Sequence, residues 1–122
     1  MLSTEIHEAA VDFGRALNQA PAVTAYRAAA DAFASDPVAQ SLMADLREQQ
    51  SIVARAQRTG LAPSREQIDR MRLCQTAVRA NEVIMGHLRA TNEVKAFLPA
   101  VAGEVSRALG TDFGSLIAQA SC

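Results

Sequence analysis

Apolar residues recur three and four positions apart along most of the chain, which is the spacing of one face of an α-helix. The clearest stretch runs from Asp36 to Gly60. Asp36 can cap the first free N–H groups, Pro37 suits the first helical position, and Gly60 can close the end. The pattern predicts one long helix whose inner face consists of Ala39, Leu42, Leu46, Val53 and Ala56.

A second long apolar face follows the short turn around Gly60 and Pro63. Ser64 and Gln67 have the spacing of a capping box, so a helix is expected to begin there. Its inner positions then alternate three and four apart, at Met71, Cys74, Val78, Asn81, Met85 and Leu88. Two long helices joined by a short turn predict an antiparallel hairpin made of Asp36–Thr59 and Ser64–Leu88.

Shorter helical patterns flank this hairpin. One helix is expected to open at Ser3 or Thr4 and to end at Pro21, with Ile6 and Phe13 on its inner face. A second helix begins at Pro21 and stops before Asp36, because the residue before a proline disfavours helix.

After the hairpin, the helical pattern resumes at Asn92 and closes at Gly110, and a last short helix covers Phe113–Ala120. Alternation of period two, the mark of a strand, never persists for more than a few residues. The chain is therefore expected to be all-α, an antiparallel bundle of five or six helices around the long hairpin, forming a single domain over residues 1–122.

Each long helix carries one polar residue in its apolar seam, Gln49 in the first and Asn81 in the second. Such a residue reduces stability and commonly fixes register or partner choice. In the expected hairpin the two amides lie roughly 9 Å out of step at 1.5 Å per residue, so they should not bond within one chain. At least one is expected to meet an opposing chain. The expected interaction residues are Gln49, Asn81, Leu46, Val53 and Arg72.

The composition indicates that apolar surface is buried between two copies of the chain. Hydrophobic residues make up 49% of the 122 positions but aromatic residues only 4%. Much of the apolar content is alanine, which packs helices closely but buries little area per residue. A small helical domain with so thin a core often completes it by oligomerising, so self-association is expected.

The net charge and the apolar pattern argue against nucleic-acid binding, membrane insertion and secretion. A net charge of −1 offers no electrostatic footprint for DNA, RNA or an anionic membrane. No apolar run approaches the roughly 20 residues of a membrane span, and the N-terminus lacks the features of a secretion signal. The chain is expected to be cytoplasmic.

Arginines crowd the two long helices and could touch RNA phosphates. Nearby Asp45, Glu48, Glu66 and Asp69 balance them, which favours a solvated face and leaves an RNA-binding module as an alternative. The arginines are Arg47, Arg55, Arg58, Arg65, Arg70, Arg72 and Arg79.

The two cysteines, Cys74 and Cys122, are expected to be thiols in the cytoplasm. They cannot alone supply the four thiolates of an iron–sulfur cluster. A cluster shared between subunits, or another metal or redox role for these two residues, is a further alternative. No nucleophile, base and orienting group can be named together, so no enzyme activity and no cofactor are expected.

The order of landmarks along the chain resembles that of one known family. The landmarks are Tyr26 with Ala29, Asp36-Pro37 with Ala39, Leu42, Leu46 and Gln50, then Gly60, Ser64 with Glu66, Asn81 with Leu88 and Ala90, Leu109-Gly110, and Asp112-Phe113. From the first helix to Phe113 this order resembles the YlbF/YmcA family of small bacterial regulators.

The resemblance implies an all-helical cytosolic adaptor that self-associates or assembles with paralogues and is not an enzyme. It also implies an action on the messenger-processing ribonuclease RNase Y and, through it, on competence, sporulation and biofilm formation. Some members hold iron–sulfur clusters as complexes, using cysteines partly near the C-terminus. This chain keeps Cys122 but lacks a cysteine cluster.

Overall fold

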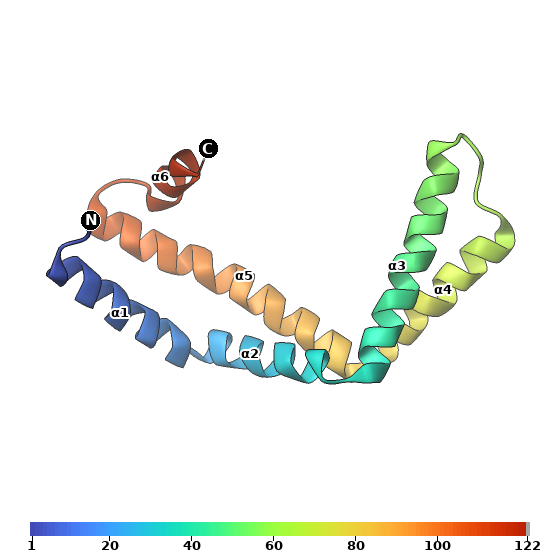
Figure 1. The fold of residues 1–122 in the computed structure, drawn as a ribbon, viewed down its shortest axis with the longest axis horizontal. Coiled ribbons are helices and arrows are strands. Elements are labelled where there is room, and N and C mark those ends of the chain that lie inside the picture. The colour runs from blue at the N-terminus through green and yellow to red at the C-terminus, as the bar shows by residue number, and fades with distance from the viewer. Residues whose placement is uncertain (122) are drawn as a thin grey trace. The chain divides into compact units, whose positions relative to one another are not determined.

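The computed structural model of the protein describes residues 1–121, which form six helices and no strand (Figure 1). The helices are α1 (Thr4–Gln19), α2 (Pro21–Ala34), α3 (Pro37–Arg58), α4 (Arg65–Ala80), α5 (Glu82–Leu109) and α6 (Phe113–Ala120). The predicted all-α class is confirmed. No helix in this part of the chain is both long enough and apolar enough to cross a membrane.

Local capping explains where α3 and α4 begin and end. The Asp36 carboxylate accepts hydrogen bonds from the backbone N–H groups of Val38 and Ala39, both at 3.0 Å. The Ser64 hydroxyl accepts from the Gln67 N–H at 3.1 Å, and the Gln67 amide oxygen accepts from the Ser64 N–H at 2.8 Å. After α3, Gly60 has a φ of 76°, the left-handed conformation that favours glycine. The predicted capping signals therefore mark both ends of α3 and the start of α4.

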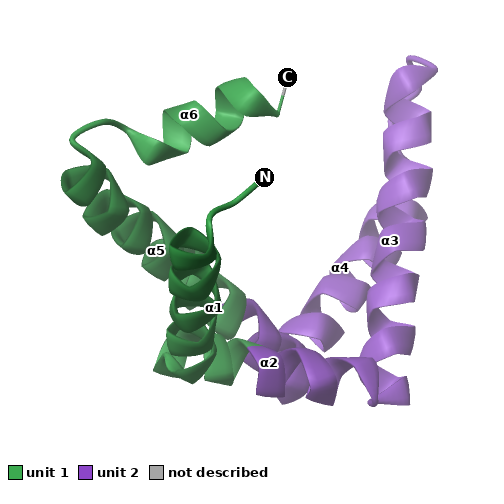
Figure 2. Ribbon diagram, turned by 60° about the vertical axis from the view of Figure 1, so that its left-hand side comes forward, with its two compact units in different colours: residues 1–26, 90–122 green, residues 27–89 purple. Residues whose placement is uncertain are grey.

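The chain clusters into two compact units, and both boundaries between them fall inside helices (Figure 2). One unit contains Met1–Tyr26 and the segment that begins at Ala90, so it includes α1, the later part of α5 and α6. The other unit, Arg27–Arg89, includes α3 and α4. The expectation of a single domain over residues 1–122 stays a prediction.

Helices α3 and α4 pack against each other as an antiparallel hairpin, as both ribbon views show (Figures 1 and 2). The first predicted arm is confirmed. The second arm was expected to reach Leu88, and this was wrong, because α4 ends at Ala80 and α5 begins at Glu82. The expectation that a new helix begins at Asn92 was also wrong, since α5 is continuous through that position.

The break between α4 and α5 lies at Asn81. This residue has φ −86° and ψ 115°, an extended conformation, and its side-chain oxygen accepts a hydrogen bond from the Ile84 N–H at 2.9 Å. Asn81 therefore caps α5 and is not a polar residue inside a continuous seam. The physical reason is that asparagine satisfies free N–H groups at a helix start, and the acidic Glu82 in the first turn favours the same place.

Few large side chains are fully buried within one chain. The buried hydrophobic residues of the described part are Ala39, Ile84 and Ala90. On α1, Ile6 is exposed and Phe13 is 46% exposed, so the expectation that they form a buried inner face does not hold for a single chain. One chain folds its helices but leaves much of their apolar surface in contact with solvent.

The burial pattern predicts unequal costs for two truncations. Ile84→Ala removes a side chain that is 6% exposed, whereas Leu73→Ala removes one that is 71% exposed. We expect Ile84→Ala to lower the free energy of unfolding by about 2–4 kcal/mol and Leu73→Ala to change it by less than about 0.5 kcal/mol. Chemical denaturation measures both variants, and equal losses would contradict the assigned burial.

The capping role of Asn81 predicts the sign of a second pair of substitutions. Asn81→Leu removes the acceptor for the Ile84 N–H and should lower the free energy of unfolding by about 0.5–2 kcal/mol. Asn81→Asp keeps an acceptor and should stay close to the parent. The same denaturation assay applies, and a leucine variant more stable than the parent would restore the interpretation of Asn81 as a seam residue.

Candidate interaction surface

The hairpin of α3 and α4 carries most of the residues expected to make contacts. Leu46, Gln49 and Val53 lie on α3 and are half-buried, and Cys74 is half-buried on α4. Arg72 lies on α4 and is exposed. Their roles in binding stay predictions.

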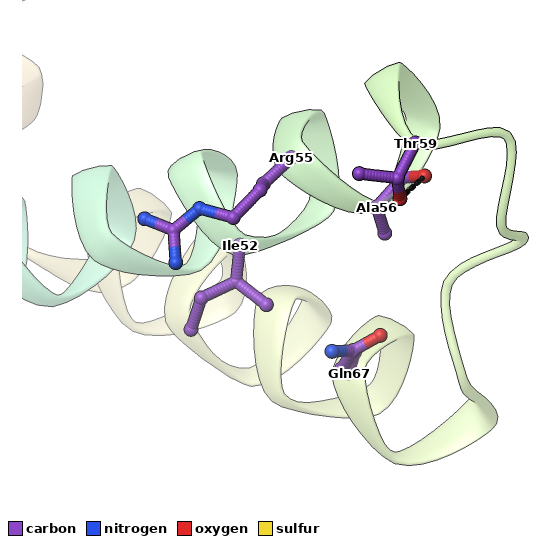
Figure 3. A pocket seen from close by; sticks show the side chains of 5 residues that line it. All are labelled: Ile52, Arg55, Ala56, Thr59 and Gln67. Atoms are coloured by element: carbon purple, nitrogen blue, oxygen red, sulfur yellow. Dashed lines mark hydrogen bonds between the residues drawn. The ribbon is translucent and has the colours of Figure 1, made fainter.

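A hollow of about 270 Å³ lies near the free end of the hairpin (Figure 3). It is lined by Ile52, Arg55, Ala56 and Thr59 of α3 and by Gln67 of α4. Ile52 points from α3 toward α4 in Figure 3. The Thr59 hydroxyl donates to the Ala56 carbonyl at 2.9 Å, and Gln67 is held by its capping bonds. Because these polar groups already form hydrogen bonds within the hairpin, we interpret the hollow as a gap between packed helices.

The Gln49 side chain makes no hydrogen bond to another residue of the described part, and its half-buried position leaves it within reach of water. Water can then satisfy the amide in a single chain. If a second polypeptide covered this face, the amide would need a new partner, because an unsatisfied buried amide costs about 1–3 kcal/mol. The expected role of Gln49 in partner choice therefore stays a prediction.

The metal and redox alternative rests on Cys74 and Cys122. Within residues 1–121, no group of three or more His, Cys, Asp or Glu side chains is arranged to hold a metal ion. Cys122 lies outside the described residues. The expected involvement of this cysteine pair therefore stays untested.

One contact in the hairpin's unit was not foreseen from the sequence. The rings of Phe33 on α2 and His87 on α5 stack, with centroids 5.2 Å apart and an angle of 10° between the ring planes. The apolar stripe beside His87 indicated partial burial, but periodicity within one helix cannot show which ring of another helix it meets. The stack joins α2 to the first turns of α5.

One carboxyl group stands out electrostatically. Asp112 caps α6, and the hydrogen bond from the Ser115 hydroxyl to its carboxylate, at 2.7 Å, lowers the pKa of Asp112. The Ser115 and Gly114 backbone N–H groups act in the same direction, while the slight desolvation of the carboxyl group opposes them. Hydrogen bonds to the ionised form favour it, so the charged carboxylate is suited to cap the start of α6.

The chain is similar to a known protein family and to a solved structure. A family model described as control of competence regulator ComK, YlbF/YmcA, matches residues 6–110. No curated protein gives a significant match. Among solved structures, the chain is similar to the X-ray crystal structure of Bacillus subtilis RicA in complex with RicF, with 21% sequence identity and a TM-score of 0.72. The match covers 89% of this chain and 96% of that chain, and at this identity it shows a shared fold.

The half-buried position of Gln49 predicts that an apolar replacement raises the stability of the chain and lowers its selectivity for partners. Gln49→Leu should raise the free energy of unfolding by about 1 kcal/mol, since it extends the apolar seam, and should broaden the distribution of oligomers seen by light scattering. The exposed neighbour provides a matched control, because Gln50→Leu should change neither quantity. A less stable Gln49→Leu variant with an unaltered oligomer distribution would show that the amide is an ordinary satisfied group.

Proposed function

The chain belongs to the YlbF/YmcA family, and we propose that it is a non-enzymatic regulatory adaptor that works through protein–protein contacts. The family description names the control of a competence regulator, which supports the regulatory part of the proposal. The similar solved structure contains RicA bound to RicF, which supports protein partners as the mode of action.

The observation that carries this proposal is the uncovered apolar surface of the helices. Ile6 and Phe13 on α1 and Leu116 and Ile117 on α6 all belong to one unit, and all are exposed. A contiguous exposed apolar surface commonly marks a site that binds another protein. We infer that a second polypeptide covers them, either another copy of this chain or a paralogue.

The cellular target is proposed from the family resemblance. We place the protein in the cytoplasm and propose that its complex acts on a ribonuclease of the RNase Y type, and through it on developmental control. The absence of a membrane-spanning helix among the described residues is compatible with that location.

Experiments on the purified chain can test the self-association part of this proposal. Light scattering at tens of micromolar should give a mass of at least two chains, because the apolar faces of α1 and α6 need cover. A mass of one chain throughout that range would contradict self-association and would leave only assembly with a different protein.

A further inference from the structure

Two surfaces of opposite charge lie in different units of the chain. We propose that the acidic face of α1 in one copy docks against a row of arginines on α4 of a second copy. This inference rests on the self-association proposed above and assigns charged surfaces to it.

The arginine row consists of Arg65, Arg72 and Arg79, which follow one another at intervals of seven residues. Residues seven apart lie on one side of a helix, here about 10.5 Å from one to the next. All three are exposed, and Ile68 lies on the same side between the first two. The row therefore presents positive charge around an apolar centre.

These arginines have no ion-pair partner in the described part of the chain. Their neighbour Arg70 differs, because it pairs with Glu66 at 2.7 Å. Asp69 lies within one turn of Arg65 and Arg72, yet no ion pair joins it to either of them. The charge of the row is thus available to an outside partner.

The acidic face of α1 consists of Glu5, Glu8 and Asp12, at spacings of three and four that place them on one side of the helix. A hollow of about 330 Å³ adjoins this face and is lined by His7, Glu8, Val11 and Asp12. Asp12 forms a long, exposed ion pair with Arg15 at 3.4 Å, which contributes little. Glu5 and Glu8 form no ion pair among the described residues.

The two surfaces match in spacing and in character. Glu5 and Asp12 are seven residues apart, the same interval as Arg65 and Arg72. The exposed Val11 lies beside Glu8 and Asp12, as Ile68 lies beside the arginines. Two helices laid side by side can therefore bring carboxylates to guanidinium groups while the two apolar side chains meet, as at the flanking positions of a coiled coil.

The charge of the two units supports contact between unlike surfaces. Counted from the sequence, Arg27–Arg89 contains nine basic and seven acidic residues, a net charge of +2. The remaining residues contain three basic and six acidic, a net charge of −3, which agrees with the total of −1. Exposed ion pairs contribute little energy individually, so their role here is to orient and select the partner while apolar burial supplies most of the stability.

Charge reversal with complementation tests the contact. One variant carries Arg65→Glu and Arg72→Glu, and a second carries Glu8→Lys and Asp12→Lys. A control with the same change of charge carries Arg47→Glu and Arg58→Glu, two exposed α3 positions outside the row. Circular dichroism verifies that each variant is helical, and sedimentation measures its self-association.

We expect each of the first two variants to weaken self-association by about tenfold or more and the control to change it by less than about twofold. An equimolar mixture of the first two variants should associate again, because the reversed arginine row of the first then meets the reversed acidic face of the second, and the two unaltered surfaces also match. A single chain with all four substitutions should also associate, because both surfaces are then reversed. High salt should weaken association of the parent chain.

The outcomes separate the two proposals. A parent chain that stays monomeric contradicts self-association itself. A parent chain that associates, with arginine-row variants that behave like the control or with a mixture that shows no recovery, overturns only the docking of α1 on α4. Micromolar binding of a single-stranded RNA that the arginine-row variant loses, with unaltered self-association, would overturn it too and would assign the row to RNA.

Discussion

An alanine-rich helix buries little apolar area per residue, and this constraint limits how much of its own surface the chain can cover. Two of the three buried hydrophobic residues of the described part are alanines, Ala39 and Ala90, and only Ile84 is large. Ile6 and Phe13 of α1 and Leu116 and Ile117 of α6 remain exposed. Close packing of small residues brings the helices together, but a thin core of this kind leaves the larger apolar groups for contacts between polypeptides.

The α3–α4 hairpin shows how local interactions offset that thin core. Asp36 fixes the start of α3, and the reciprocal bonds of Ser64 and Gln67 fix the start of α4. With its ends set by capping, the hairpin holds Leu46, Gln49 and Val53 along one half-buried face without large aromatic anchors. A surface assembled in this way is only partly buried, which suits the binding of other proteins that we propose.

Much of this fold follows from signals that act over one or two helical turns. The ends of α3 and the start of α6 were predictable because Asp36, Gly60 and Asp112 act on backbone groups close to them in sequence. The break at Asn81 was missed because the three-and-four alternation of apolar positions continues across it, so only the capping chemistry of Asn81 and Glu82 reveals it.

Other features depend on pairings between helices, which periodicity within one helix does not specify. The stack of Phe33 on His87 is of this kind. The exposure of Phe13 is another, because its place in an apolar stripe does not show whether another helix of the chain covers that stripe. For the candidate site, the sequence indicated the hairpin but could not indicate which faces remain open.

The central claim is that the native state of this chain is completed by a second copy of the same chain. The dependence of the thermal midpoint on protein concentration tests it most directly, because mass action stabilises an associated native state as concentration rises. We expect the midpoint of the purified chain to increase by several degrees over a hundredfold increase in concentration. A midpoint that stays constant over that range would contradict the claim, since the fold would then owe none of its stability to another copy.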